Sequence, residues 1–363
     1  MQKSISGPLL SGLARAQSWA RALPWPQPLR DGAARMQSWL RSWPWPLLIR
    51  RLAVVTTAGM FLVLVMGTLV TNSGSAHGCG QSWPLCNGQF IPQFAVSTAI
   101  EFSHRAVTGI ESLLVFALTA GVLWLWRGRR EIRLLAPLMV IFLLAQAALG
   151  ALAVMYPTAP EILALHFGVS LISFASILLT ALFIYELGGW DRLRDRPIPR
   201  GFRRLTFATI AFSYVVVYLG AYVRHTDSQL ACVDWPLCNG KLFPGFIGGM
   251  GIMFTHRLAA LLLAGGIVWL FLWARRMRGP RPDLYWGALA ALVCVVLQAL
   301  EGAFIVYSRM DIFSTLAHGG IVALLFGALC YLCLHVLPRP AAARKADQRG
   351  RFRRRRAVAP ARG

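Results

Sequence analysis

The sequence EFSHR at residues 101–105 precedes a long apolar run, residues 106–126. It places a carboxylate, an imidazole and a guanidinium at the point where a helix would enter a membrane. Glu101 and His104 are three residues apart, so they share one face of a helix. Ionisable groups are costly at such depth, which makes these side chains candidates for a functional site.

The stretch returns in altered form as MFTHR at residues 253–257, an offset of 152 residues. The second copy keeps the histidine and the arginine but has Met253 in place of Glu101. The same offset relates WPLCNG at 83–88 to 235–240, Gln146 to Gln298, Gly150 to Gly302, and His166 to His318. A constant offset over this length predicts a chain made of two repeated halves.

The composition is typical of a polytopic membrane protein. The chain has 363 residues, of which 56% are hydrophobic and 14% are charged, whereas soluble domains carry about 25% charged residues. A net charge of +23 suggests nucleic acid at first sight. However, 32 of the 37 Lys and Arg residues lie in the two tails and in three loops between apolar runs. This distribution follows the positive-inside rule and argues against a nucleic-acid partner.

Eight apolar runs approach the roughly 20 residues that a spanning helix needs. They lie at about residues 52–71, 99–126, 134–155, 161–187, 205–223, 248–273, 284–306 and 312–337. The predicted fold class is an all-α membrane protein with eight transmembrane helices arranged as two pseudo-symmetric four-helix bundles. The basic segments place both termini in the cytoplasm and the cysteine-containing loops outside the cell membrane.

The same patterns divide the chain into five regions. They are a basic N-terminal cytoplasmic extension at 1–51, an N-terminal bundle at 52–187, a cytoplasmic linker at 188–204, a C-terminal bundle at 205–337, and a basic cytoplasmic tail at 338–363. The extension has two interpretations, a membrane-surface segment or a poorly ordered tail, and Met36 is an alternative start.

Four histidines are expected at matching depths near the outer ends of their helices: His104, His166, His256 and His318. In each half they fall on the second and fourth helices, which run in the same direction. Two imidazoles that face each other across a bundle are suitable axial ligands for a haem iron. Arg105 and Arg257 are then available to the haem propionates. Histidines that only form hydrogen bonds between helices are the alternative, and zinc or copper sites are less favoured.

Glu101 is the element that breaks the repeat. A carboxylate beside one haem pocket can accept a proton or stabilise developing positive charge. The alternative is an acid placed at the start of a helix, where the macrodipole favours it. Glu111, seven residues after His104, is interpreted as a polar packing contact inside the bundle.

The outer loops contain cysteines in pairs, Cys79 with Cys86 and Cys232 with Cys238. An oxidising compartment allows each pair to form a disulfide, and the spacings of seven and six residues permit one. Both a structural staple and a redox role remain open for these pairs.

These motifs together resemble the haem A synthase family over about residues 52–337. That family oxidises the C8 methyl group of haem O to a formyl group, giving haem A for terminal oxidases. The resemblance implies a resident haem b on His256 and His318. It also implies a substrate site for haem O at His104 and His166, with Glu101 essential to the reaction.

The resemblance further implies that the cysteine pairs assist activity or haem transfer. Haem O synthase and terminal-oxidase assembly factors are candidate partners, together with membrane lipid. Two other functions remain open at this point: a membrane di-haem b electron-transfer cytochrome, and a haem carrier without catalysis. The sequence leaves the electron donor, the oxidant and the oligomeric state undetermined.

Overall fold

The computed structural model describes residues 42–156 and 160–338. Most of the expected N-terminal extension, and all but the first residue of the expected C-terminal tail, lie outside these ranges. The described part of the chain contains eight helices that are long and apolar enough to cross a membrane. The all-α, eight-span prediction is therefore confirmed, and the chain is a multi-pass membrane protein.

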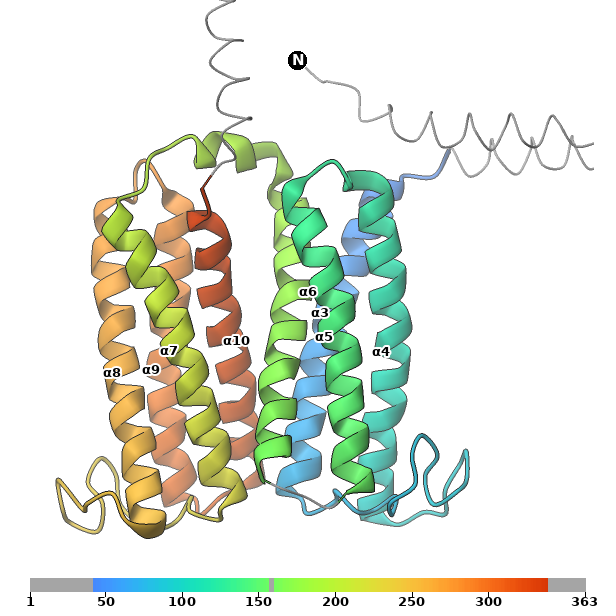
Figure 1. The fold of residues 1–363 in the computed structure, drawn as a ribbon, viewed down its shortest axis with the longest axis vertical. Coiled ribbons are helices and arrows are strands. Elements are labelled where there is room, and N and C mark those ends of the chain that lie inside the picture. Colours follow the sequence, from blue (N-terminus) through green and yellow to red (C-terminus); the bar gives the residue numbers. More distant parts are fainter. Residues whose placement is uncertain (1–41, 157–159, 339–363) are drawn as a thin grey trace, which may run out of the picture. The chain divides into compact units, whose positions relative to one another are not determined.

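The chain separates into two compact units, and the boundary follows Tyr185. The first unit contains α3 (Trp45–Asn72), α4 (Val96–Trp126), α5 (Arg130–Met155) and most of α6 (Pro160–Arg194). The second contains the end of α6 with α7 (Arg200–His225), α8 (Gly248–Arg276), α9 (Pro282–Tyr307) and α10 (Ile312–Val336). Within each unit the helices stand side by side and nearly parallel, with one long loop at one end (Figure 1).

Local sequence signals explain where several helices begin. A proline occupies the first turn of α3 and of α9, where its missing N–H group costs nothing. The Asp311 carboxylate caps α10 by accepting hydrogen bonds from the backbone N–H groups of Phe313 and Ser314. Inside the spans, hydroxyl groups such as that of Thr57 donate to the carbonyl four residues earlier, which keeps them satisfied in an apolar medium.

The segment expected as a linker, residues 188–204, is largely helical. Helix α6 continues to Arg194 and α7 begins at Arg200, so only five residues separate them. The extension of α6 is stabilised by Trp190, which is 1% exposed and packs edge-on against the His335 ring with 4.6 Å between centroids.

The long loops of the two units repeat each other in conformation. Asn87 and Asn239 both have positive φ, at 51° and 53°, and the glycine that follows each has φ of 76° and 75°. Within α3 and α7, however, the equivalent residues are 153 positions apart, not 152. The loop of the second unit is one residue shorter between its first cysteine and its tryptophan, which accounts for the cysteine spacings of seven and six.

Candidate functional site

Each of the four candidate histidines packs against a glycine of a neighbouring helix. His104 faces Gly67 and His166 faces Gly150, while His256 and His318 face Gly220 and Gly302. A Cβ atom on these glycines would lie 3.4, 3.2, 2.9 and 3.7 Å, respectively, from the Cε1 atom of the imidazole. A side chain would therefore crowd the ring at Gly150 and Gly220, whereas at Gly67 and Gly302 it would make an ordinary van der Waals contact.

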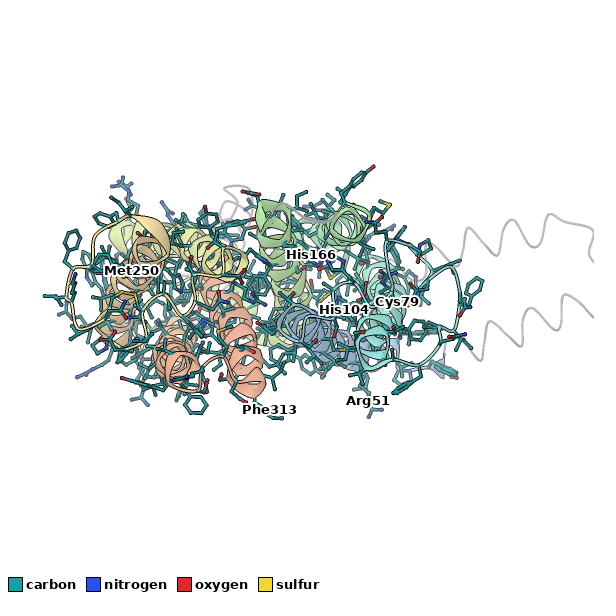
Figure 2. All side chains as sticks on the ribbon, turned by 90° about the horizontal axis from the view of Figure 1, so that it is seen from below. Arg51, Cys79, His104, His166, Met250 and Phe313 are labelled. Atoms are coloured by element: carbon teal, nitrogen blue, oxygen red, sulfur yellow. A yellow bond between two sulfur atoms is a disulfide. The ribbon has the colours of Figure 1, made fainter. Side chains whose placement is uncertain are left out.

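The histidine rings retain an unused ligand capacity. In all four, the Nδ1 atom is buried and has no hydrogen-bond partner in the ranges that the structure describes. A buried polar atom without a partner is unfavourable, so such atoms call for a specific explanation. Two imidazoles per unit, each on a bundle helix, form a donor set that can hold a haem iron. Figure 2 places His104 and His166 among the helices of the first unit rather than at its outer rim.

Glu101 links the histidine helix to the disulfide loop of the first unit. Its side chain is 3% exposed although it lies in the second turn of α4, one turn before His104. One carboxylate oxygen accepts a hydrogen bond from the backbone N–H of Cys79 at 2.8 Å. The other accepts from the Arg105 guanidinium at 2.5 Å. Glu101 is therefore not simply an acid at a helix N-terminus, because its charge is paired across a loop that begins far away in the sequence.

Arg105 holds the same loop from a second side. Its Nη1 atom donates to the carbonyl oxygens of Ser82 and Leu85, both at 2.8 Å. The side chain expected to meet a haem propionate thus already has three partners within the protein. In the second unit Arg257 donates to the carbonyl oxygen of Leu237, the counterpart of Leu85. The buried Nη2 atom of Arg257 has no partner among the residues described.

The second unit replaces the carboxylate with an apolar cluster. Met253, at the position of Glu101, is 8% exposed and packs with Cys232, Cys238, Val223 and Val306. The two units therefore share the histidines, glycines and loop but differ in the group that faces the loop. Only the first unit brings a negative charge to that place.

Both cysteine pairs are disulfides in the structure. The Cα atoms of Cys79 and Cys86 are 4.4 Å apart, and those of Cys232 and Cys238 are 4.6 Å apart. The predicted pairing is confirmed. Each disulfide closes a loop that leads directly into a histidine-bearing helix.

A further carboxylate shapes the loop of the second unit. Asp234 accepts hydrogen bonds from the backbone N–H groups of Gly240 at 2.7 Å and Asn239 at 2.5 Å. The N–H group of Gly240, with that of Asn239, holds the pKa of the Asp234 carboxyl below its ordinary value. In the first unit Ser82 stands at this position, and its hydroxyl accepts from the N–H of Gly88 at 3.3 Å.

His335, near the end of α10, is buried at 1% exposure. Its Nδ1 atom lies 2.7 Å from the Asp283 carboxylate, which also pairs with the buried Arg281 guanidinium at 2.6 Å. Its Nε2 atom lies 3.1 Å from the Glu186 carboxylate, and Tyr331 donates to the other oxygen of that group. Sequence reasoning missed this network because its members come from three helices.

The glycine partners were also missed as site residues. Gly150 and Gly302 were visible as a repeated pair, but nothing in their sequence context indicated that they face histidines. Gly67 and Gly220 stand at the offset of 153 rather than 152. A comparison of the two halves that allowed one deletion would have found them.

Comparison with known proteins identifies relatives that match most of the described region. A family model, COX15-CtaA, described as cytochrome oxidase assembly protein, matches residues 50–330. A protein named Heme A synthase from Bacillus licheniformis is 42% identical, over 79% of this chain and 96% of its own length. Proteins of the same name from Bacillus pumilus and Lysinibacillus sphaericus are 42% and 40% identical, over 79% and 78% of this chain and 94% of their own lengths. The chain belongs to the COX15-CtaA family of cytochrome oxidase assembly proteins.

Proposed function

We propose that this chain is a haem A synthase, a membrane oxidoreductase that converts the C8 methyl group of haem O into a formyl group for terminal oxidases. The observation that carries the proposal is the asymmetry between the units. Each unit has a histidine pair, glycines that face the imidazoles, and a disulfide loop. Among these four histidines, however, only His104 has a buried carboxylate one helical turn away. The names of the relatives support the same reaction.

The two units have different roles in this proposal. His104 and His166 hold the substrate haem O, and His256 and His318 hold a resident haem b. Haem b would supply a centre through which electrons leave the substrate site. The glycines that face the four imidazoles allow each ring to lie close to the neighbouring helix, so that the ring is oriented before haem binds.

Glu101 acts beside the reacting carbon. Conversion of the methyl group to an alcohol and then to an aldehyde takes its oxygen atom from water and releases four protons and four electrons, the electrons passing to an external acceptor. Removal of electrons develops positive charge at the carbon. Both carboxylate oxygens of Glu101 already accept a hydrogen bond, one from the Cys79 N–H group and one from the Arg105 guanidinium. A carboxylate still has lone pairs free, so Glu101 stabilises the cationic carbon or accepts its proton without leaving its place.

The surroundings of the protein follow from the charge pattern and from the proposed reaction. Both termini lie in the cytoplasm, and the disulfide loops lie outside the cell membrane. The substrate makes haem O synthase and terminal-oxidase assembly factors the expected partners. The disulfide loop of the first unit keeps Glu101 in position, so it assists the reaction even if its sulfur atoms take no part in electron transfer.

Pigment analysis tests the proposal. The chain is expressed in cells that supply haem O, and the extracted haems are separated and identified by mass. We expect haem A, or its hydroxylated precursor, with the wild type and unchanged haem O with Glu101→Gln. Haem b alone in the wild type would instead favour an electron-transfer cytochrome, and unchanged haem O in the wild type would favour a carrier.

A further inference from the structure

The two units differ a second time, one level deeper in the bundle. The difference concerns the residues seven positions after each histidine. These residues lie two helical turns, or about 10 Å, farther along the helix. In the first unit these residues are Glu111 and Ser173, and in the second they are Leu263 and Leu325. Two turns after the histidines, on the side away from the disulfide loop, the first unit therefore has polar residues and the second unit has leucines.

Glu111 is buried with one oxygen unused. The residue is 2% exposed, and its Oε2 atom packs so closely on α3 that a Cβ atom at Gly59 would lie 2.1 Å away. A side chain at position 59 would force this carboxyl group to move. The Oε1 atom has no hydrogen-bond partner within residues 42–156 and 160–338. A carboxyl group left in this state is costly.

Two hydroxyl groups of the same unit share this condition. Ser173 and Thr56 are 0% exposed, and neither Oγ of Ser173 nor Oγ1 of Thr56 has a partner in the described chain. By contrast, Ser170 and Ser176 on the same helix as Ser173 both donate to the carbonyl four residues earlier. Ser173 thus differs from its neighbours in keeping its hydroxyl group free. We call Thr56, Glu111 and Ser173 the polar floor.

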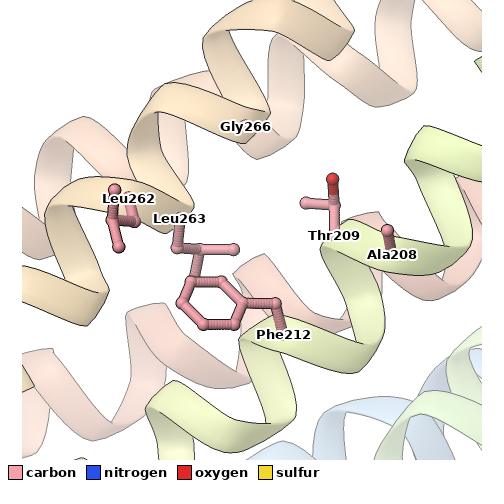
Figure 3. Close-up of a pocket in the computed structure, with 6 residues that line it drawn as sticks. All are labelled: Ala208, Thr209, Phe212, Leu262, Leu263 and Gly266. Carbon is pink, nitrogen blue, oxygen red and sulfur yellow. The ribbon is translucent and has the colours of Figure 1, made fainter.

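The second unit has leucines in place of Glu111 and Ser173, whereas Thr209 retains the hydroxyl group of Thr56. An open pocket of about 170 Å³ between α7 and α8 is lined by Ala208, Thr209, Phe212, Leu262, Leu263 and Gly266 (Figure 3). Phe212 stands where the first unit has Gly59, and Leu263 stands where it has Glu111.

We propose that the polar floor binds a hydroxyl group on the inward rim of the substrate and so selects haem O over haem b. This inference rests on the proposed function. Haem O and haem b differ in one substituent: haem O has a long isoprenoid chain whose first carbon bears a hydroxyl group, where haem b has a vinyl group. This substituent is on the pyrrole ring opposite a propionate-bearing ring.

The expected orientation of the haem brings this hydroxyl group to the polar floor. Charged propionates are costly in the bilayer interior, so the propionate rim faces the nearby membrane surface. The opposite rim then points along α4 and α6 toward Glu111 and Ser173. The hydroxyl group donates to the Glu111 carboxyl oxygen that lacks a partner and accepts from Ser173. A site with buried hydrogen-bonding groups discriminates strongly against an analogue that cannot pair with them.

Binding selectivity tests the inference separately from turnover. The full chain is purified with haem b in the second unit, and the remaining site is titrated with haem O and with haem b by absorption difference spectra. The variants are Glu111→Leu, which copies the second unit, and Glu111→Gln, which retains a hydrogen-bonding group. The unchanged haem b content of the second unit and the intact first disulfide establish that each variant is folded.

We expect the wild type and Glu111→Gln to bind haem O at least about tenfold more tightly than haem b. In Glu111→Leu this preference should fall below about threefold, chiefly through weaker binding of haem O. An undiminished preference in Glu111→Leu would overturn the inference, as would an equal loss of affinity for both haems. Normal selectivity with lost turnover would also overturn it, because Glu111 would then act on protons. If wild-type protein binds haem O selectively but does not oxidise it, the proposed function fails and this inference does not.

Discussion

The bond between Glu101 and the Cys79 amide should control how often the first disulfide loop opens. We consider Glu101→Met, which installs the residue found at this position in the second unit. The substitution removes the hydrogen bond from the Cys79 N–H group and the ion pair with Arg105, while the two bonds from Arg105 to loop carbonyls can persist. A hydrogen bond to a charged group contributes about 1.5–3 kcal/mol. Since about 1.4 kcal/mol is tenfold, the open loop should become about 10–100 times more populated.

Reduction kinetics measure this opening. The purified chain is treated with an excess of a phosphine reductant, free thiols are alkylated at intervals, and peptides from the two loops are quantified by mass. The Cys232–Cys238 disulfide serves as the comparator within the same molecule, because Met253 already stands beside it. We expect the first disulfide to be reduced about 10–100 times faster in the variant, while the second keeps its wild-type rate.

A rate for the first disulfide that stays within about twofold of the wild type would refute this reasoning, since the predicted change is at least about tenfold. It would mean that the Arg105 contacts or the loop itself hold the backbone in place. Parallel acceleration of both disulfides would also contradict it, because that result would indicate global loosening of the chain.

Other substitutions test separate parts of the structure. Gly220→Ala should strongly reduce the haem content of the purified protein, measured by pyridine haemochrome absorbance, because its Cβ atom would lie 2.9 Å from the imidazole; Gly302→Ala, at 3.7 Å, should be tolerated. The amide hydrogen bonds to Asp234 stabilise its loop above about pH 4, the ordinary range of an unfolded aspartate, and are lost as the pH falls through the lowered pKa. In the wild type, reduction of the second disulfide should therefore become faster as the pH falls through this range. Asp234→Asn should be reduced faster than the wild type at neutral pH and should show no further increase at acid pH. Asp283→Ala should destabilise the second unit by about 3–5 kcal/mol, because it leaves the Arg281 charge buried alone, whereas replacing both residues by leucine should cost less. Thermal aggregation in detergent would rank these two variants, and equal losses would contradict the ion-pair argument.

Hydropathy and the repeat were sufficient to predict the helices of this chain. Each span needs a long apolar run, and the Arg-rich connections mark one end of the helices. The four histidines and the cysteine pairs could be recognised because they recur at nearly one offset. The helix ends were less accurate, because residues 188–194 contain charges that favour a loop by composition. In the structure Trp190 packs on His335 and keeps α6 helical.

The contacts of the site could not be predicted to the same extent. Glu101 bonds to Cys79, 22 residues away, only because the loop folds back over α4. Arg105 was expected to be free for a haem propionate, and no local pattern indicates that loop carbonyls bind it. Glu111 was interpreted as a packing contact, and its unpartnered oxygen became evident only with Gly59 of another helix in place. Such interactions depend on tertiary packing, which periodicity within one helix does not specify.

The most direct test of the assignment of substrate haem and resident haem to separate units is to identify and quantify the haems bound to the purified protein. The wild type is compared with His104→Ala/His166→Ala and with His256→Ala/His318→Ala, all from cells that supply haem O. We predict that the first double variant keeps haem b but contains neither haem O nor haem A, and that the second loses haem b. Equal loss of haem b from both variants, or haem A in the first, would contradict the assignment of substrate and resident haem to separate units.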